Sequence, residues 1–149
     1  MTTTVFVIVL VGGILAVQLL IAVPLVIWWR RRSRQVAAWL AAELEGDTVV
    51  LGPEKGAYRG ATAPGYPVVK NNGMIALTRR RLIFRTLTNT TIEVPVAEIT
   101  RVREQSVFKG SVTGGRPHLI VTTAGGDIGF YVFSGIGPWI AALTPTTRL

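Results

Sequence analysis

Residues 73–84, with the sequence GMIALTRRRLIF, carry the pattern from which the fold can be read. Ile75 and Leu77 fall on one face of an extended chain, and so do Leu82 and Phe84 after the three arginines. An apolar period of two residues indicates β-strands. The polar run between the two halves indicates a tight connection. The stretch therefore predicts a β-hairpin.

Short segments of the same kind lie on both sides of this hairpin. They predict five more strands. The first covers residues 48–51 and ends at Gly52-Pro53, although residues 57–62 could extend it. The other four lie at residues 91–94, 99–107, 118–123 and 128–133. A Gly-rich loop is expected at residues 109–116. A short helix is expected from Gly135 to Leu143, ended by Pro145. About seven strands and one helix indicate a mainly β domain, either a sandwich or a partly open barrel. We expect Trp139 to plug it, in a core with Leu77, Leu82, Phe84, Ile92, Val94 and Phe130.

Two segments resemble the GRAM and bacterial pleckstrin-homology-like (PH-like) domains. They are residues 73–84 and residues 92–102, IEVPVAEITRV, and the closing helix with Trp139 also fits. The resemblance covers residues 48–143 and implies a PH-like partly open barrel. Members of the family bind phosphoinositides, other anionic lipids or proteins. The resemblance implies lipid contacts near the first hairpin, where this sequence offers Lys55, Arg59 and Lys70.

The N-terminal part has the character of a membrane anchor. Residues 5–29 contain no charged side chain, and about 20 apolar residues suffice to span a bilayer as a helix. Trp28 and Trp29 suit the headgroup boundary. A cleaved signal peptide is the alternative, but it has a basic start and an apolar run of only about 7–15 residues. The sequence favours an uncleaved single span.

Four arginines, Arg30, Arg31, Arg32 and Arg34, follow this run, whereas residues 1–4 carry no charged side chain. Because basic residues flank a span on its cytoplasmic side, we expect the N-terminus outside the plasma membrane and the C-terminal domain in the cytoplasm. An anchor joined to one such domain also resembles small actinobacterial membrane proteins. Gly12 and Ala16 could allow close packing of two spans, so the oligomeric state stays open.

A second helix is expected from Ser33, as its N-cap, to Leu44, with Gly46 as its stop. Its Trp39 could lie on the membrane or pack on the domain. The expected organisation is thus an anchor at residues 1–29, a basic juxtamembrane segment with an amphipathic helix at residues 30–46, and a PH-like domain at residues 47–149.

Composition excludes several kinds of chemistry. The chain has no cysteine, which rules out disulfides, thiol catalysis and cysteine-bound zinc and fits a reducing cytoplasm. Its one histidine, His118, cannot form a zinc site or a Ser-His-Asp triad by itself. The carboxylates show no paired spacing, and residues 110–115 lack the Lys-Ser/Thr of a phosphate loop. We expect no enzyme activity, metal or cofactor.

The function expected from the sequence is binding. Residues 46–149 contain twelve basic and six acidic residues. Residues 129–133, GFYVF, match an RNA-recognition strand too poorly to indicate nucleic acid. The first hypothesis is a scaffold or accessory subunit that binds a protein partner in the membrane. The alternative is anionic lipid at the inner leaflet, held by the hairpin tip Arg79, Arg80 and Arg81 together with Lys55, Arg59 and Lys70. Arg101, Arg103, Lys109 and Arg116 could form a second basic edge.

Overall fold

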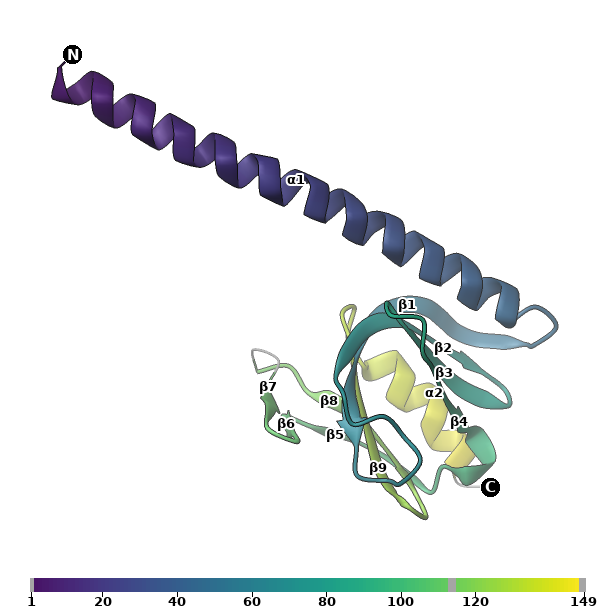
Figure 1. Cartoon of the computed structure of the whole chain (residues 1–149). Coiled ribbons are helices and arrows are strands. Elements are labelled where there is room, and N and C mark those ends of the chain that lie inside the picture. The colour runs from purple at the N-terminus through teal and green to yellow at the C-terminus, as the bar shows by residue number, and fades with distance from the viewer. Residues whose placement is uncertain (1, 113–114, 148–149) are drawn as a thin grey trace. The chain divides into compact units, whose positions relative to one another are not determined.

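The computed structural model describes residues 2–112 and 115–147, and of residues 111, 112 and 145–147 it describes only the backbone. The chain divides into two compact units, Met1–Arg34 and Gln35–Leu149. Each unit is described by itself. The second unit holds all the strands (Figure 1).

The first unit contains the apolar part of helix α1 and the arginines that follow it. The whole helix runs from Thr3 to Glu43. Its mean hydropathy reaches 2.9 over 18 residues, and no residue of that window is buried. By length and composition this helix can cross a membrane. The expected N-cap at Ser33 is wrong, because α1 passes through it without a break. No glycine or proline lies between Pro24 and Gly46, and alanine and arginine favour helix.

The second unit is built on one antiparallel sheet of seven strands in the order β4-β3-β2-β1-β9-β8-β5. The bounds are β1 Val49–Ala61, β2 Asn71–Thr78, β3 Arg81–Thr86, β4 Thr91–Pro95, β5 Arg101–Gln105, β8 His118–Thr123 and β9 Gly126–Val132. The two-stranded pair β6 Val107–Phe108 and β7 Ser111–Val112 is separate. Helix α2, Gly137–Thr147, packs against β5 and β1. A mainly β domain with a C-terminal helix is confirmed.

Three boundaries differ from those expected. The fifth strand begins at Arg101 because Pro95 is followed by a short 3-10 helix, η1, at Val96–Glu98. The Gly-rich stretch contains β7, while its residues 113 and 114 lie outside the described part. Helix α2 continues through Pro145 to Thr147. A proline removes only one N–H donor, and the helix extends only two residues beyond it.

The main core lies between the sheet and α2. It contains all seven residues expected there, including Trp139, which is 0% exposed. The rings of Tyr58, Phe84 and Phe130 pack at centroid distances of 5.7–6.2 Å. Trp139 donates its indole N–H to Glu54 Oε2 over 3.1 Å. This bond holds α2 to the central strand β1.

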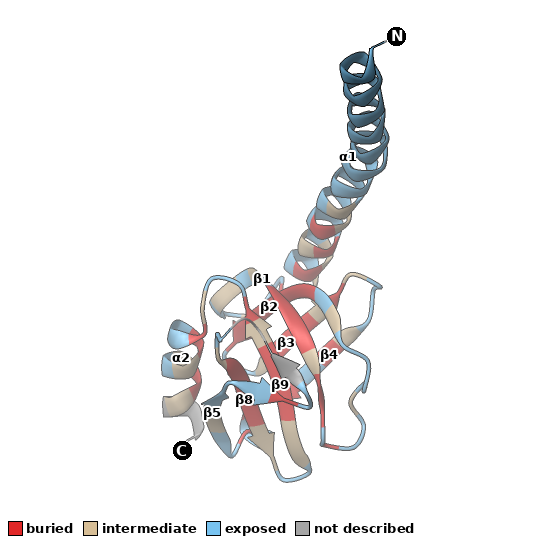
Figure 2. Cartoon of the chain, turned by 90° about the vertical axis from the view of Figure 1, so that its left-hand side faces the viewer, coloured by how far each residue is buried: buried red, intermediate tan, exposed pale blue. Residues whose placement is uncertain are grey.

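A second cluster lies on the opposite face of the sheet. Val36, Leu40 and Leu44 pack there with Met74, Ala76 and Ile83, and Trp39 packs against them. Figure 2 shows buried residues in red on the end of α1 and on the strands. Residues from Gln35 therefore belong with the sheet. This unit, Gln35–Leu149, therefore includes residue 46, where the sequence predicts a boundary.

Candidate interaction surface

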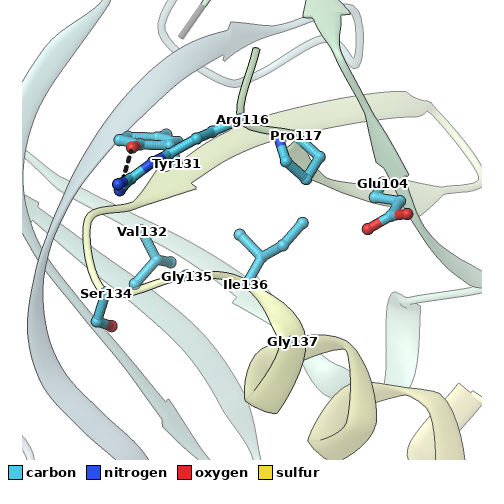
Figure 3. Close-up of a pocket in the computed structure, with 9 residues that line it drawn as sticks. All are labelled: Glu104, Arg116, Pro117, Tyr131, Val132, Ser134, Gly135, Ile136 and Gly137. Carbon is cyan, nitrogen blue, oxygen red and sulfur yellow. Dashed lines mark hydrogen bonds between the residues drawn. The ribbon is translucent and has the colours of Figure 1, made fainter. Parts of the chain in front are cut away.

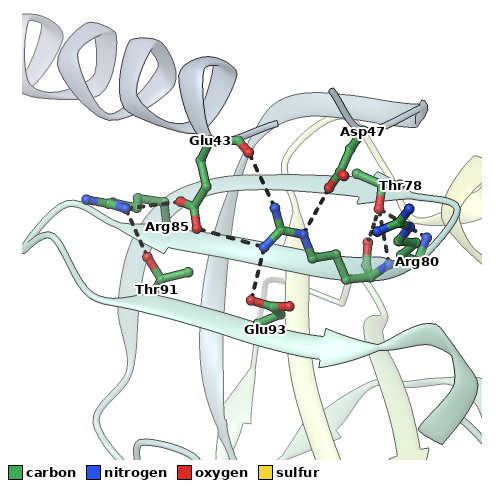
Figure 4. Close-up of polar contacts among 8 residues, drawn as sticks. Glu43, Asp47, Thr78, Arg80, Arg85, Thr91 and Glu93 are labelled. Atoms are coloured by element: carbon green, nitrogen blue, oxygen red, sulfur yellow. Dashed lines mark hydrogen bonds and ion pairs between the residues drawn. The ribbon is translucent and has the colours of Figure 1, made fainter. Parts of the chain in front are cut away.

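The three arginines of the predicted hairpin tip, residues 79–81, do not share one environment. Arg79 and Arg80 are exposed. Arg81 instead turns toward the end of α1, where its Nε donates to Asp47 Oδ2 over 3.1 Å and its Nη1 to Glu93 Oε2 over 3.1 Å. Its Nη2 also donates to the Glu43 carbonyl over 3.4 Å (Figure 4). The expectation that all three arginines are exposed together is therefore wrong for Arg81.

Arg85 completes this contact. Its Nη1 lies 3.1 Å from Glu43 Oε2 and 3.0 Å from Thr91 Oγ1 (Figure 4), and its guanidinium stands 5.4 Å from the centre of the Trp39 ring. Of the two positions considered for Trp39, the membrane and the domain, the structure shows the second. Arg81 and Arg85 serve to hold the last turns of α1 on β2, β3 and β4. Their charge is directed at acids of this chain.

A different group of cations gathers at the other end of β2. Arg59, at the end of β1, places its guanidinium 5.9 Å from the centre of the Tyr131 ring. Lys70 donates to the Lys109 carbonyl over 3.4 Å, and Lys109 donates to the Ala61 carbonyl over 3.1 Å. We call Arg59, Lys70 and Lys109 the basic cluster. Of the residues expected at the first hairpin, Lys55 lies earlier in β1, exposed, and is not part of it.

The sequence predicts a common site for Arg59 and Lys70 but not for Lys109. Lys109 was grouped with Arg101, Arg103 and Arg116 in a second basic edge, which the structure divides. Arg103 instead binds Asp127, with Nη2 and Oδ2 2.7 Å apart. No local pattern indicates that Lys109 meets Lys70, because 38 residues and five strands separate them.

Arg81, Arg85 and Arg103 form ion pairs with acids of the chain. None of them joins the basic cluster to a described acid. The Arg59 Nε atom is buried and without a hydrogen-bond partner among the described residues. The cluster is therefore a surface of positive charge that the described chain does not neutralise.

A cleft of about 350 Å³ adjoins the basic cluster at Tyr131. Val132 and Ile136 are buried in its floor, and Pro117 borders it. Figure 3 shows Arg116 beside Tyr131 on one side of the cleft and Glu104 on the other. Arg116 donates to the Tyr131 hydroxyl over 3.4 Å and to the Phe133 carbonyl over 3.3 Å. Tyr131 also packs on Phe133, with ring centres 5.5 Å apart.

His118 lies beneath this surface and is 0% exposed. Its Nδ1 is 3.1 Å from the Gln105 carbonyl, and its Nε2 has no partner among the described residues. Burial lowers the pKa of His118, and the positive charges of Arg59 and Lys70 lower it further. A neutral, buried ring of this kind has a structural role. Among the described residues, no three His, Asp or Glu side chains are placed to hold a metal ion.

The juxtamembrane arginines belong to the first unit. Arg30, Arg31 and Arg34 are exposed on α1, and Arg32 is partly exposed. The structure places them directly after the apolar run, in the same helix. They form a band of charge at one end of the segment that can cross a membrane.

Comparison with known proteins leaves the family open. No family model matches the chain, and no curated protein matches it. The chain is similar to a solved structure, the C-terminal domain of an unknown protein from Leishmania infantum, with 15% sequence identity and a TM-score of 0.49. The similarity covers 72% of this chain and 91% of that one.

Proposed function

We propose that this chain is a membrane-anchored interaction module that binds a partner protein, as a scaffold or accessory subunit of a membrane assembly. The observation that carries the proposal is the meeting of Tyr131, Phe133, Arg59 and Arg116 around one cleft. Tyrosine and arginine dominate the energetic centres of protein interfaces, and such centres lie in pockets. Phe133 is 38% exposed, so an apolar contact is available beside them.

We propose that the domain is PH-like, as the resemblance of residues 73–84 and 92–102 implies. The support is a curved antiparallel sheet with one helix after the last strand, and a buried Trp139 on that helix. Domains of this kind act by binding. We therefore propose no catalysis, no cofactor and no nucleic acid, which agrees with a histidine that is buried beneath the surface.

The proposed setting is the inner face of the plasma membrane. We propose that the apolar part of α1 spans it once, with the N-terminus outside and the domain in the cytoplasm. The support is the length and hydropathy of the helix and the exposed arginines that follow the apolar run. Basic residues are retained on the cytoplasmic side.

Anionic lipid is the second candidate, and a separate observation favours it. Val68 and Val69 are 71% and 70% exposed, next to Lys70. Exposed aliphatic side chains beside lysines suit the membrane interface. The exposed Arg79 and Arg80 could add attraction of about 1 kcal/mol each near an anionic leaflet.

Photocrosslinking in intact membranes separates the two candidates. A photoreactive amino acid is placed at Phe133 of the full chain, and a matched control carries it at Ala97, which is exposed in η1. We expect a protein adduct of discrete mass from position 133 and none from position 97. Adducts with lipid alone from position 133 would replace the partner-protein proposal by the lipid one. The same protein adduct from both positions would show that the surface is not selective.

A further inference from the structure

We infer that the basic cluster and the cleft together bind one acidic, extended segment of the partner protein. Its carboxylates would lie against Arg59, Lys70 and Lys109, and an apolar side chain that follows them would enter the cleft. This inference rests on the proposed function and specifies the chemistry of the partner.

Charge complementarity is the first argument. The basic cluster brings three cations from separate segments together, and no described acid pairs with them. Two of the three are held in place, Lys70 on the Lys109 carbonyl and Lys109 on the Ala61 carbonyl. Arg59 is held over Tyr131, with its guanidinium 5.9 Å from the centre of the ring. A carboxylate can accept hydrogen bonds from such a guanidinium in a forked geometry.

The second argument is the polarity of the cleft. Arg116 and Tyr131 border it on the side that adjoins the basic cluster, and Glu104 borders it on the other (Figure 3). A segment bound across it would therefore place acids toward Arg59 and a neutral or basic group toward Glu104. The floor, Val132 and Ile136, suits an apolar side chain between them.

The distance between Arg59 and Tyr131 limits how far apart the acidic and apolar residues of the bound peptide can be. Arg59 and Tyr131 lie on the adjacent strands β1 and β9, and adjacent strands are about 4.8 Å apart. An extended peptide advances about 3.3 Å per residue. The acids should therefore lie one to three positions from the apolar residue, with a basic residue on its other side.

An extended peptide segment fits this surface better than a bilayer does. The cleft is concave, whereas a bilayer meets the outermost side chains of a domain. Glu104 on the rim would repel an anionic leaflet but would attract a basic group of a peptide. The membrane is therefore the alternative outcome of the test.

The test uses the full chain in micelles of a neutral detergent and a fluorescent probe peptide of sequence Glu-Asp-Glu-Leu-Gly-Lys. A matched peptide carries Gln-Asn-Gln in place of the three acids. Fluorescence anisotropy should show the acidic peptide binding about tenfold more tightly, with a difference that shrinks in high salt because exposed charges are screened. His118, the single histidine of the chain, gives a second readout by NMR. Its pKa should rise on binding, because the peptide offsets the charges of Arg59 and Lys70.

Two variants and two controls assign the effect to residues. Lys70→Gln should lower the affinity for the acidic peptide by up to about fivefold, which is the usual contribution of an exposed ion pair. Arg59→Gln should lower this affinity at least as much. Arg79→Gln, at the opposite end of β2, should change it less than twofold. Glu104→Gln should weaken only peptides that keep the terminal lysine. Lys70 is exposed, so its variant remains informative if Arg59→Gln fails to fold.

Three results would overturn the inference. They are equal binding of the acidic and neutral peptides, equal loss in Arg79→Gln and Lys70→Gln, and binding of anionic vesicles but not of the peptide through Arg59 and Lys70. A protein adduct at Phe133 together with equal peptide binding would leave the proposed function standing and reject the acidic partner alone.

Discussion

At the scale of single residues, Trp139 shows how one side chain can fix an element. It is fully buried, and its indole N–H binds Glu54, which also accepts a hydrogen bond from Ser134 over 2.8 Å. Trp139→Ala should lower the free energy of unfolding by about 3–5 kcal/mol, as large-to-small core changes do. Chemical denaturation of the full chain measures this. Unfolding that matches the wild type would mean that α2 does not close the core.

Arg80 and Arg81 are neighbours with different roles, and a matched pair of variants separates them. Arg81→Ala removes contacts to Glu43, Asp47 and Glu93. These three contacts are partly exposed, so we expect the free energy of unfolding to fall by about 1–2 kcal/mol. Arg80→Ala should stay within about 0.5 kcal/mol of wild type. Denaturation curves in the same detergent give both values, and equal losses would contradict the division of the arginine tip.

His118 makes stability depend on pH. Burial and nearby cations lower its pKa from 6.5, so the unfolded chain takes up a proton at a higher pH than the folded chain. Stability should therefore fall as pH falls below about 6.5, by at most about 1.4 kcal/mol per pH unit for one proton. Denaturation at pH 7.5 and 5.5 measures the change. His118→Phe should flatten it, and an unchanged slope in that variant would assign the titration elsewhere.

At the scale of elements, Arg103 on β5 and Asp127 on β9 hold the edge of the sheet. The hydrogen bond from Arg103 is the largest cause that lowers the pKa of Asp127 below 3.8, and Thr122 adds to it. The resulting stability is present above pH 3.8 and is lost as pH falls through the lower, folded value. Arg103→Gln should cost up to about 1 kcal/mol at pH 7, because the pair is partly exposed.

The difference between Arg103→Gln and wild type should vanish in strong acid, where Asp127 is protonated in both states. Denaturation at pH 7 and near pH 2 makes the comparison. Arg80→Gln, which is exposed in the connection between β2 and β3 and is not among the charges that lower the pKa of Asp127, is the matched control. A constant difference at both pH values would show that Arg103 acts through packing and not through the charge of Asp127.

The strands could be predicted from the sequence, whereas the surface could not. Alternation along residues 74–86 sets which side chains enter the main core, and the structure confirms Leu77, Leu82 and Phe84 there. The same alternation placed Ile83 on the other face, but nothing local showed that α1 covers it. The partners of Arg81 and Lys109 are distant in sequence. Their contacts depend on the sheet order, which periodicity does not encode.

Helix α1 is continuous from Thr3 to Glu43, whereas the sequence predicts two helices that meet near Ser33. A run of arginines after an apolar segment looks like a boundary, because its polarity changes abruptly. Helix propensity does not change there, since arginine and alanine both favour helix. Gly46 does end the helix region, with φ +90, where glycine is favoured. Polarity therefore located the end of the apolar run, and glycine located the end of the helix.

At the scale of the whole molecule, some basic residues pair with acids of the chain and others stay exposed. Residues 35–149 contain twelve basic and eight acidic residues. Acids of the chain neutralise Arg81, Arg85 and Arg103, and the basic cluster keeps its charge. The net charge alone would suggest a uniform attraction to anions. The arrangement instead places three of these charges together at one end of β2, beside the cleft.

Orientation in the membrane decides which partners this surface can meet, and the absence of cysteine makes it measurable. Thr2→Cys and Ala97→Cys each place a single thiol at an exposed position. Because arginines follow the apolar run, we expect a membrane-impermeant maleimide to label position 2 in intact cells stripped of their outer layers. Position 97 should be labelled only after the cells are permeabilised. The reverse pattern would place the basic cluster outside the cell and exclude a cytoplasmic partner, while labelling of both positions in intact cells would exclude a membrane span.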